Sequence, residues 1–223
     1  MIVVHHLENS RSQRILWLLE ELGVPYSVKR YPRDPKTKLA PPELKAVHPL
    51  GKSPVITDDG EVIAETGAII EDILERHGNG RLMPAAGTPE HRRLRYWLHY
   101  AEGSIMPLLV MKLIFTATTR PPTPWLIRPI AKAIAGGVGQ AYIDPNLKQN
   151  LTMIEAELGK TGWFVGHDLT AADIIMSFPL QAAMSRGGAA SGFPNIAAFL
   201  AKIEARPAYK KALEVGGPFA LLS

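Results

Sequence analysis

Cysteine is absent from this chain of 223 residues. The absence excludes disulfide bonds, thiolate metal sites, a cysteine nucleophile and a mixed disulfide with a small thiol. The histidines at His5-His6 and His99, even with Glu102 nearby, do not have the spacing of a recognised metal site. We therefore predict that the chain binds no metal, and that any sulfur chemistry uses the thiol of a ligand.

Long apolar runs and strong charge of one sign are also missing. No segment reaches the ~18 uninterrupted apolar residues typical of a membrane span, and Met1–Ser10 lacks the basic and apolar regions of a secretory signal. The formal net charge is only +4, and the basic cluster at 91–95 has no interleaved aromatic motif. We expect a cytoplasmic protein without a membrane span and without a nucleic-acid partner.

The first eighty residues alternate strand and helix signals. Residues 2–4 indicate a buried strand, residues 15–22 show helical apolar periodicity, and residues 26–31 alternate as a second strand. Asn9 and Ser10 precede the helix, and both are good N-cap residues. A strand–helix–strand unit of this length predicts parallel strands with a right-handed crossover.

A short helix follows, and then a hairpin and a further helix. Residues 55–57 and 61–63 are β-branched runs separated by Asp58-Asp59-Gly60, which is a hairpin turn signal, and Thr66 opens the next helix. The order βαβ–α–ββα predicts an α/β thioredoxin-like domain over residues 1–80.

The second half of the chain carries only helix signals. A connector containing proline and glycine over residues 81–89 marks the predicted domain boundary, and residues 90–223 are expected to form an all-α domain. Thr170 and Asp173 have the spacing of a capping box at a helix start, so we interpret Asp173 as a structural residue.

Two short segments of the first domain could bind one ligand. Pro54 lacks the donor that a strand needs, so it belongs to a sheet edge, a bulge or a cis turn. We expect the cis bond after Ser53, which would leave the Ser53 backbone free to pair with an extended ligand. The helix start at Thr66 suits a carboxylate, while Lys52 and Glu65 add one charge of each sign. Glu65 could instead serve only the helix dipole, and Lys52 only the turn. The ligand predicted by the pattern is peptide-like, with a carboxylate at each end.

These two halves together resemble the cytosolic glutathione transferases over essentially the whole chain. The most specific stretches are His-Pro-Leu-Gly-Lys-Ser-Pro-Val at 48–55, Glu-Thr-Gly-Ala-Ile-Ile at 65–70 and Asn-Ser-Arg-Ser-Gln-Arg at 9–14. The absence of a tyrosine between the first strand and helix resembles the serine-type bacterial and fungal enzymes, although Thr66 stands where a serine is more usual. The resemblance implies a homodimer that uses glutathione as co-substrate, needs no cofactor and presents a hydrophobic pocket to a small electrophile.

The resemblance also implies roles for individual residues. Ser10, at the corner between strand and helix, would donate its hydroxyl to the glutathione sulfur, although it could be only a cap. Asn9 is the competitor, because its amide can also donate. Ser12 should point away if it lies in the helix, where two residues rotate the side chain by about 200°. The glutathione-binding residues would be Lys52, Ser53, Pro54, Val55, Glu65 and Thr66.

Thiol chemistry sets what Ser10 must achieve. Lowering a thiol pKa by two units requires about 2.7 kcal/mol, whereas one neutral hydrogen bond contributes ~1 kcal/mol. We therefore expect the positive end of the first helix, with Arg11 and Arg14, to supply the remainder. Candidates for the hydrophobic electrophile cleft are Tyr100, Ser104, Met106 and Met111.

Two other functions remain open from the residues alone. A glutathione-dependent peroxidase could run on the ligand's own thiol, and a non-catalytic binding module could use the same fold. A further hypothesis concerns the apolar segment at 125–131, which follows prolines that break the helix and is expected to cover the electrophile site.

Overall fold

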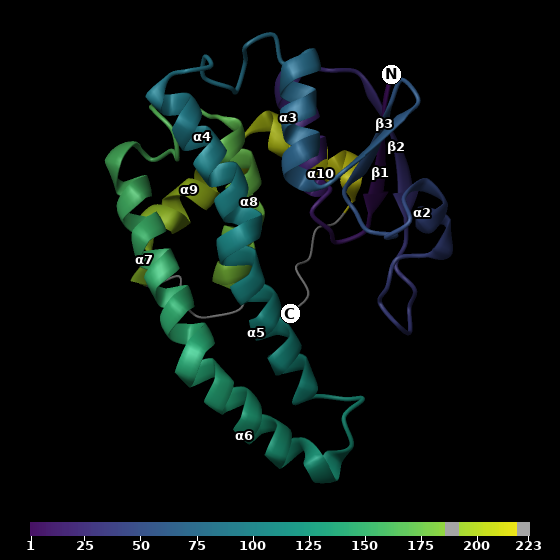
Figure 1. The fold of residues 1–223 in the computed structure, drawn as a ribbon, viewed down its shortest axis with the longest axis vertical. Helices are drawn as coiled ribbons and strands as arrows, with labels where there is room; N and C mark the ends of the chain where they lie inside the picture. Colours follow the sequence, from purple (N-terminus) through teal and green to yellow (C-terminus); the bar gives the residue numbers. More distant parts are fainter. Residues whose placement is uncertain (186–191, 218–223) are drawn as a thin grey trace.

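A four-stranded sheet and its helices stand beside a larger helical bundle (Figure 1). This arrangement comes from a computed structural model, which describes residues 1–185 and 192–217. The segments 186–191 and 218–223 of the predicted helical domain lie outside the described residues. The strand and helix order confirms the α/β domain followed by helices that the sequence predicts.

The sheet has the strand order β2-β1-β3-β4. β1 (Ile2–Leu7) pairs in parallel with β2 (Tyr26–Tyr31), as the crossover rule predicts, and antiparallel with β3 (Val55–Asp58). β4 (Glu61–Ala64) closes the edge as the second strand of the hairpin. The start of β3 therefore lies next to the end of β1, where the chain turns into its first helix.

Helices cover both faces of the sheet. α1 (Gln13–Leu22) and α3 (Thr66–His77) share the main hydrophobic core with the helical bundle. α2 (Pro42–Val47) covers the other face. A separate small cluster of buried side chains forms there: Leu7, Tyr31 and Leu44.

The predicted start of α1 is wrong by two residues. Asn9 and Ser10 are not the N-cap; that position belongs to Ser12, and α1 begins at Gln13. Asn9 has φ 50°, a left-handed conformation that asparagine tolerates better than most residues. The chain therefore makes a tight turn before the helix, and this turn brings Ser10 and Ser12 together.

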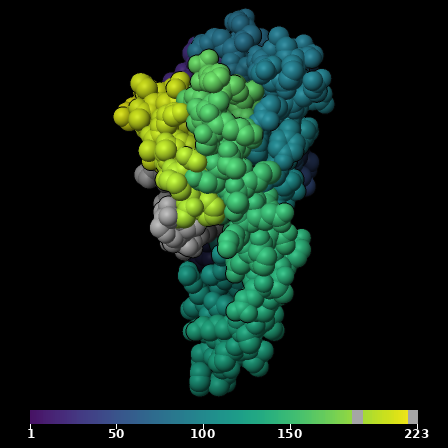
Figure 2. Space-filling model, turned by 90° about the vertical axis from the view of Figure 1, so that its left-hand side faces the viewer, coloured from purple at the N-terminus to yellow at the C-terminus, as the bar shows by residue number. Residues whose placement is uncertain are grey.

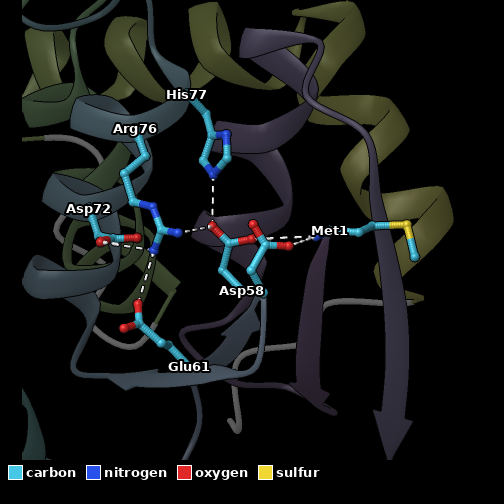
Figure 3. A network of polar contacts seen from close by, with 7 residues as sticks. Met1, Asp58, Glu61, Asp72, Arg76 and His77 are labelled. Carbon is cyan, nitrogen blue, oxygen red and sulfur yellow. Dashed lines mark hydrogen bonds and ion pairs between the residues drawn. The ribbon is translucent and has the colours of Figure 1, made fainter.

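Salt bridges and hydrogen bonds tie the β3–β4 hairpin to α3 and to the chain start (Figure 3). The carboxylate of Asp58 is buried and lies 2.8 Å from His77 Nε2 and 3.7 Å from Arg76 Nη2. The amino group of Met1 approaches the same carboxylate at 3.7 Å, and Arg76 also reaches Glu61 at 3.3 Å. The hairpin that follows the predicted ligand-binding turn is thus fixed by contacts with α3 and with the amino group of Met1.

The described residues of the second half form helices and the loops that connect them. A 3₁₀ turn over Trp125–Ile127 precedes α6. The helices are α4 (Pro89–Tyr100), the π-helical η1 (Ala101–Ile105), α5 (Met106–Thr118), α6 (Arg128–Val138), the π-helical η3 (Gly139–Ile143), α7 (Asp144–Thr161), α8 (Ala171–Ser185), α9 (Pro194–Glu204) and α10 (Pro207–Gly216).

α4, η1 and α5 form one helical rod, Pro89–Thr118, with a π-bulge in the middle. By length and composition alone this rod could cross a membrane, which is a weak indication that apolar helices of soluble folds also give. In this fold the rod packs against α6, α7 and α8. The lower end of α5 and α6 protrudes from the body as a hairpin (Figures 1 and 2).

The capping box at the start of α8 is present as predicted. Asp173 accepts hydrogen bonds from the backbone N–H of Thr170 at 2.7 Å and from its hydroxyl at 2.9 Å. A third bond comes from the backbone N–H of Phe164 at 2.9 Å. The buried carboxylate therefore satisfies groups from the loop before α8 as well as the helix end.

A buried arginine joins the two halves of the protein. Arg14 on α1 is 2% exposed, and its Nη1 donates to the backbone carbonyl of Ile175 in α8 at 2.7 Å. Pro179 lies four residues further along α8. Because proline has no N–H, the Ile175 carbonyl lacks its usual helical donor, and the guanidinium replaces it. The donor that replaces the missing N–H of this α8 proline therefore comes from the other domain.

The last helix returns to the first one. α10 packs against α1, where Tyr209 meets Trp17 edge to face with ring centroids 5.2 Å apart. A Cβ at Gly216 would lie 2.6 Å from the side-chain oxygen of Gln13 and 2.9 Å from Leu16, so a larger residue at the end of α10 would require these side chains to shift. The two domains therefore share one packed interior.

Candidate active site

The turn at residues 52–55, which the sequence predicts to bind a ligand and which we call the ligand turn, forms one wall of a small cavity of about 140 Å³. The Ser53–Pro54 bond is cis, as the sequence predicts. Further lining residues are Arg11, His48, Leu50, Ala64 and Glu102. The structure brings all six proposed glutathione-binding residues together around this cavity: Lys52, Ser53, Pro54, Val55, Glu65 and Thr66.

Glu65 holds its position through an unusual backbone conformation. Its φ is 73°, in the left-handed region that a glutamate rarely adopts. It occupies the N-cap position of α3, yet within the described structure its side chain makes no capping hydrogen bond. The carboxylate is exposed and lines the cavity, which favours a ligand role over a purely helical one.

A larger cavity of about 580 Å³ adjoins the first. The two share four lining residues: Arg11, Leu50, Lys52 and Ser53. One side of the larger cavity carries Asn9 and Ser10, and the opposite side is apolar and comes from the helical domain. The apolar wall consists of Met106, Leu109, Val110, Leu113, Phe178 and Ala182. The smaller, polar cavity thus shares a wall with a larger one that is apolar on its helical-domain side, and the two candidate thiol-binding residues lie beside the shared wall.

Ser10 belongs to a chain of hydrogen bonds that runs into the core. Its Oγ lies 2.7 Å from Ser12 Oγ, and Ser12 Oγ lies 2.9 Å from Nδ1 of the buried His6. On the cavity side, Ser10 Oγ donates to Ser53 Oγ at 3.3 Å, and Ser53 passes its own hydrogen to the backbone carbonyl of His5 at 3.1 Å. Ser10 therefore connects the ligand turn with the interior.

The reason that sequence reasoning gave for the orientation of Ser12 is wrong. Ser12 was expected to point away from the ligand sulfur because an α-helix rotates residues two apart by about 200°, and among the described residues it indeed lines neither cavity. Residues 10–12 form a turn before α1 instead, so both hydroxyls converge, and the backbone N–H of Ser12 also donates to Ser10 Oγ at 3.2 Å. Ser12 is fully buried, so it can act only through Ser10.

The expected role of Arg14 also needs correction. Its guanidinium points into the core rather than toward the cavity, and it lies 2.6 Å from Glu102 and 3.3 Å from Thr66 Oγ1. Burial lowers the pKa of Arg14, and Glu102 partly offsets this. Arg11 does line both cavities but also pairs with Glu102 at 3.3 Å. Of these two arginines, Arg11 is the one placed to favour an anion at the cavities, and its charge is partly neutralised.

Glu102 and Arg33 are residues of this region that sequence reasoning missed. Glu102 lies in the π-bulge and pairs with Arg14 on α1 and with Arg11 in the turn before α1. Arg33 lines the larger cavity and donates to the backbone carbonyls of Glu8, Asn9 and Lys38. It thereby clamps the turn that carries Asn9. No local sequence signal marks either residue, since both act across long separations.

Of the four candidates for the electrophile cleft, only Met106 lines the larger cavity. The lining found in the described chain does not include Ser104, which is exposed, or Met111. Tyr100 is buried elsewhere and donates to Asn150. The physical reason is the π-bulge, whose extra residue shifts the helical phase, so that the facing positions become 106, 109, 110 and 113.

The apolar segment at 125–131 does not cover this site. Among the described residues that line the two cavities, none lies between 121 and 131. Trp125 and Leu126 are instead 72% and 68% exposed at the tip of the protruding hairpin. The hypothesis that this segment forms a lid is therefore wrong for this conformation.

The described residues contain no cluster of three or more His, Asp or Glu side chains that could hold a metal ion. The chemical groups at the site are a hydroxyl chain, paired charges and backbone amides. Such groups can bind a zwitterionic, peptide-like molecule and donate hydrogen bonds to an anion formed on it.

Comparison with known proteins places this geometry in a family. Residues 10–76 match the family model of the glutathione S-transferase N-terminal domain, and residues 139–207 match that of the C-terminal domain. Glutathione S-transferase 3 of Schizosaccharomyces pombe is 35% identical over 96% of this chain and 87% of its own length. Glutathione S-transferase 1 of Saccharomyces cerevisiae is 34% identical over 98% of both chains.

A solved structure shows the same arrangement throughout. A glutathione S-transferase from Actinobacillus pleuropneumoniae superposes with a TM-score of 0.79 at 34% identity, covering 99% of this chain and 95% of its own. The likeness spans both halves of the chain.

Proposed function

Because this chain belongs to the glutathione S-transferase family, we propose that it ionises the thiol of bound glutathione beside Ser10 and directs the thiolate at a hydrophobic electrophile. The observation that supports this most is the shared wall between a polar cavity and an apolar one, with Ser10 beside it. Glutathione would occupy the first cavity and the electrophile the second.

Each group of glutathione has a matching partner in the polar cavity. The backbone of Ser53 would pair with the cysteinyl backbone, as an added strand pairs with a sheet edge. Glu65 would bind the γ-glutamyl ammonium, and the N–H groups and hydroxyl at Thr66 would bind its α-carboxylate. Lys52 would bind the second carboxylate, at the glycyl end. This placement directs the thiol toward the larger cavity.

A glutamine at position 65 tests the binding mode. Glu65→Gln keeps the shape of the side chain but removes its charge, so it should weaken glutathione binding by ~1.5–3 kcal/mol. This loss corresponds to a rise in Kd of about 10- to 150-fold, measured by calorimetry. Glu61→Gln, on the same hairpin but outside both cavities, is the matched control. Equal affinities in the two variants would remove Glu65 from the site.

The thiolate assignment is tested by comparing Ser10 with Asn9, since both line the larger cavity. We expect Ser10→Ala to raise the pKa of the bound thiol and to cost roughly 1–3 kcal/mol of transition-state stabilisation, with glutathione affinity little changed. Thiolate absorbance followed against pH gives the pKa directly. If only Asn9→Ala raises it, the hydroxyl of Ser10 is not the donor.

The apolar wall sets the class of second substrate. Met106 and Leu109 on α5 face Phe178 on α8 across the larger cavity, which suits a small hydrophobic molecule held against the thiolate. A panel of electrophiles should show conjugation, and the same panel should include a hydroperoxide. Peroxide reduction without conjugation would support a peroxidase, and glutathione binding without turnover would support a binding module.

We also propose that the protein acts as a cytoplasmic homodimer. Tyr96 on α4 and Met153 on α7 lie in contact and are 50% and 39% exposed, so they offer an apolar surface outside both cavities. Light scattering on the purified chain should give twice the monomer mass. A change of Tyr96 to glutamate should reduce this mass if the contact lies there.

A further inference from the structure

The hydrogen-bond chain behind Ser10 has a direction that its geometry defines. Its atoms are Ser10 Oγ, Ser12 Oγ and His6 Nδ1, separated by 2.7 and 2.9 Å. All three side chains are buried, with His6 4% exposed. The chain begins at the cavity wall and ends in the core. The hydrogen-bond chain is therefore a buried connection between the ligand cavity and one titratable group, His6.

The tautomer of His6 follows from its second partner. The imidazole lies against Gly216 at the end of α10, whose backbone carbonyl raises the pKa of His6 and so favours a ring hydrogen directed at it. Because Nδ1 already contacts Ser12, the nitrogen that carries this hydrogen is the other one, Nε2. In the neutral ring Nδ1 then has no hydrogen and can only accept. In this tautomer Ser12 donates to His6, and Ser10 turns its single hydrogen from Ser53 at 3.3 Å to the closer Ser12 at 2.7 Å.

We propose that His6 receives the thiol proton of glutathione through Ser10 and Ser12. Because His6 and Ser12 act on the ligand only through Ser10, they are positioning residues of the reaction. The inference rests on the function proposed above. The proton on sulfur passes to Ser10 Oγ, the hydrogen of Ser10 passes to Ser12 Oγ, and the hydrogen of Ser12 passes to Nδ1. One S–H bond breaks, one N–H bond forms, and the bonding pair stays on sulfur.

The same heavy-atom positions serve both protonation states. Before transfer, each group donates toward His6; after transfer, the imidazolium donates to Ser12, Ser12 to Ser10 and Ser10 to the thiolate. No side chain has to move, and every polar atom keeps a partner, so the buried chain stays satisfied throughout. The reversed chain also supplies the hydrogen bond that a thiolate needs from Ser10.

The surroundings of His6 keep it neutral until glutathione binds. Burial lowers the pKa of His6, and Arg30 on β2 lowers it further. Glu8 after β1 and the Gly216 carbonyl of α10 oppose this shift. Ser12 on the α1 side is uncharged. A thiolate at the end of the chain adds a negative charge that favours the imidazolium.

Counting protons during glutathione binding tests the relay. Calorimetry in buffers of different ionisation enthalpy gives the protons released, and ultraviolet absorbance gives the thiolate formed. We expect thiolate to appear with far less than one proton released per thiolate. We also expect the nitrogen-15 resonance of His6 Nδ1 to change to that of a protonated nitrogen. One full proton released per thiolate, with His6 neutral, would overturn the proposal.

Variants of this hydrogen-bond chain distinguish a proton-accepting role of His6 from a purely structural one. Ser12→Ala cuts the chain and should lower the thiolate fraction about tenfold at neutral pH, as a one-unit rise in the thiol pKa would. His6→Asn leaves an oxygen that can accept from Ser12 but takes no proton, so any thiolate should release its proton to solvent. His5→Asn is the matched control, because His5 contacts Tyr31 and Thr57 instead; it should keep the wild-type proton count.

The outcomes distinguish this inference from the function on which it rests. Thiolate formation with full proton release in the wild type would overturn the relay and leave the transferase proposal intact. Failure to bind glutathione, or binding without thiolate, would overturn both. The proton count and the His6 resonance are measured on the wild-type protein. They can refute the proposal even if a variant fails to fold.

Discussion

The pairing of Arg14 with a proline-interrupted helix makes a quantitative prediction. Replacing Arg14 by methionine keeps the buried stem but removes the donor at 2.7 Å from the Ile175 carbonyl. An orphaned buried carbonyl costs about 1–3 kcal/mol, and loss of a charged hydrogen bond lies at the upper end of that range. Glu102 is 31% exposed and can be rehydrated, so its share is discounted to about 1 kcal/mol. We expect Arg14→Met to reduce the free energy of unfolding by about 3–4 kcal/mol.

A double-mutant cycle with Pro179 isolates the physical cause. In the Pro179→Ala background the helix regains its own N–H for the Ile175 carbonyl, so Arg14→Met should cost less there, by about 1–2 kcal/mol. Urea unfolding followed by tryptophan fluorescence measures all four proteins. The matched control is Arg11→Met, since Arg11 is one-third exposed and shares Glu102; it should cost less than about 1 kcal/mol.

A coupling near zero would refute this reasoning. It would mean that Arg14 stabilises the protein through its charge or its packing and not by replacing the missing backbone donor. A large cost for Arg11→Met would contradict it in another way, because Glu102 would then carry most of the effect.

Three further outcomes are expected. Val110→Trp, on the apolar wall, should raise KM for bulky electrophiles severalfold and leave the Kd of glutathione unchanged; a parallel change in both would place the two ligands in one subsite. Burial lowers the pKa of His5 and His6, so the unfolded state binds more protons and stability should fall as pH drops below about 6.5. Urea midpoints should show a smaller fall for His5→Gln. Asp173→Ala leaves two buried backbone N–H groups without their acceptor and should cost about 2–4 kcal/mol in urea unfolding, whereas an unchanged midpoint would show that water replaces them.

Local patterns were sufficient for much of the first domain. The parallel β1–β2 pair, the β3–β4 hairpin and the helix at Thr66 follow from periodicity and turn residues, which act over a few positions. The six predicted glutathione-binding residues, four in the ligand turn and two at the start of α3, also lie together, because a hairpin and the following helix are adjacent in space. Their roles toward glutathione remain proposals.

The failures arose where one residue shifts the helical phase or where contacts span the chain. The turn before α1 brought Ser12 beside Ser10, where helical geometry had separated them, and the π-bulge moved the cavity-facing positions of the long rod away from Tyr100 and Ser104. The inward orientation of Arg14 had one available signal. Pro179 inside an apolar helix pattern implies a carbonyl that needs a donor, although the sequence does not say which residue supplies it.

The return of α10 to α1 constrains how this protein can be made in a cell. Residues around Trp17 leave the ribosome long before Tyr209 and Gly216, which cover one side of α1. During synthesis, that side of α1 stays uncovered after α3 and α8 have been made, and it is exposed to aggregation and to chaperones. A premature stop near residue 200 would release a chain with both family domains mostly present but with the α10-facing side of α1 still uncovered.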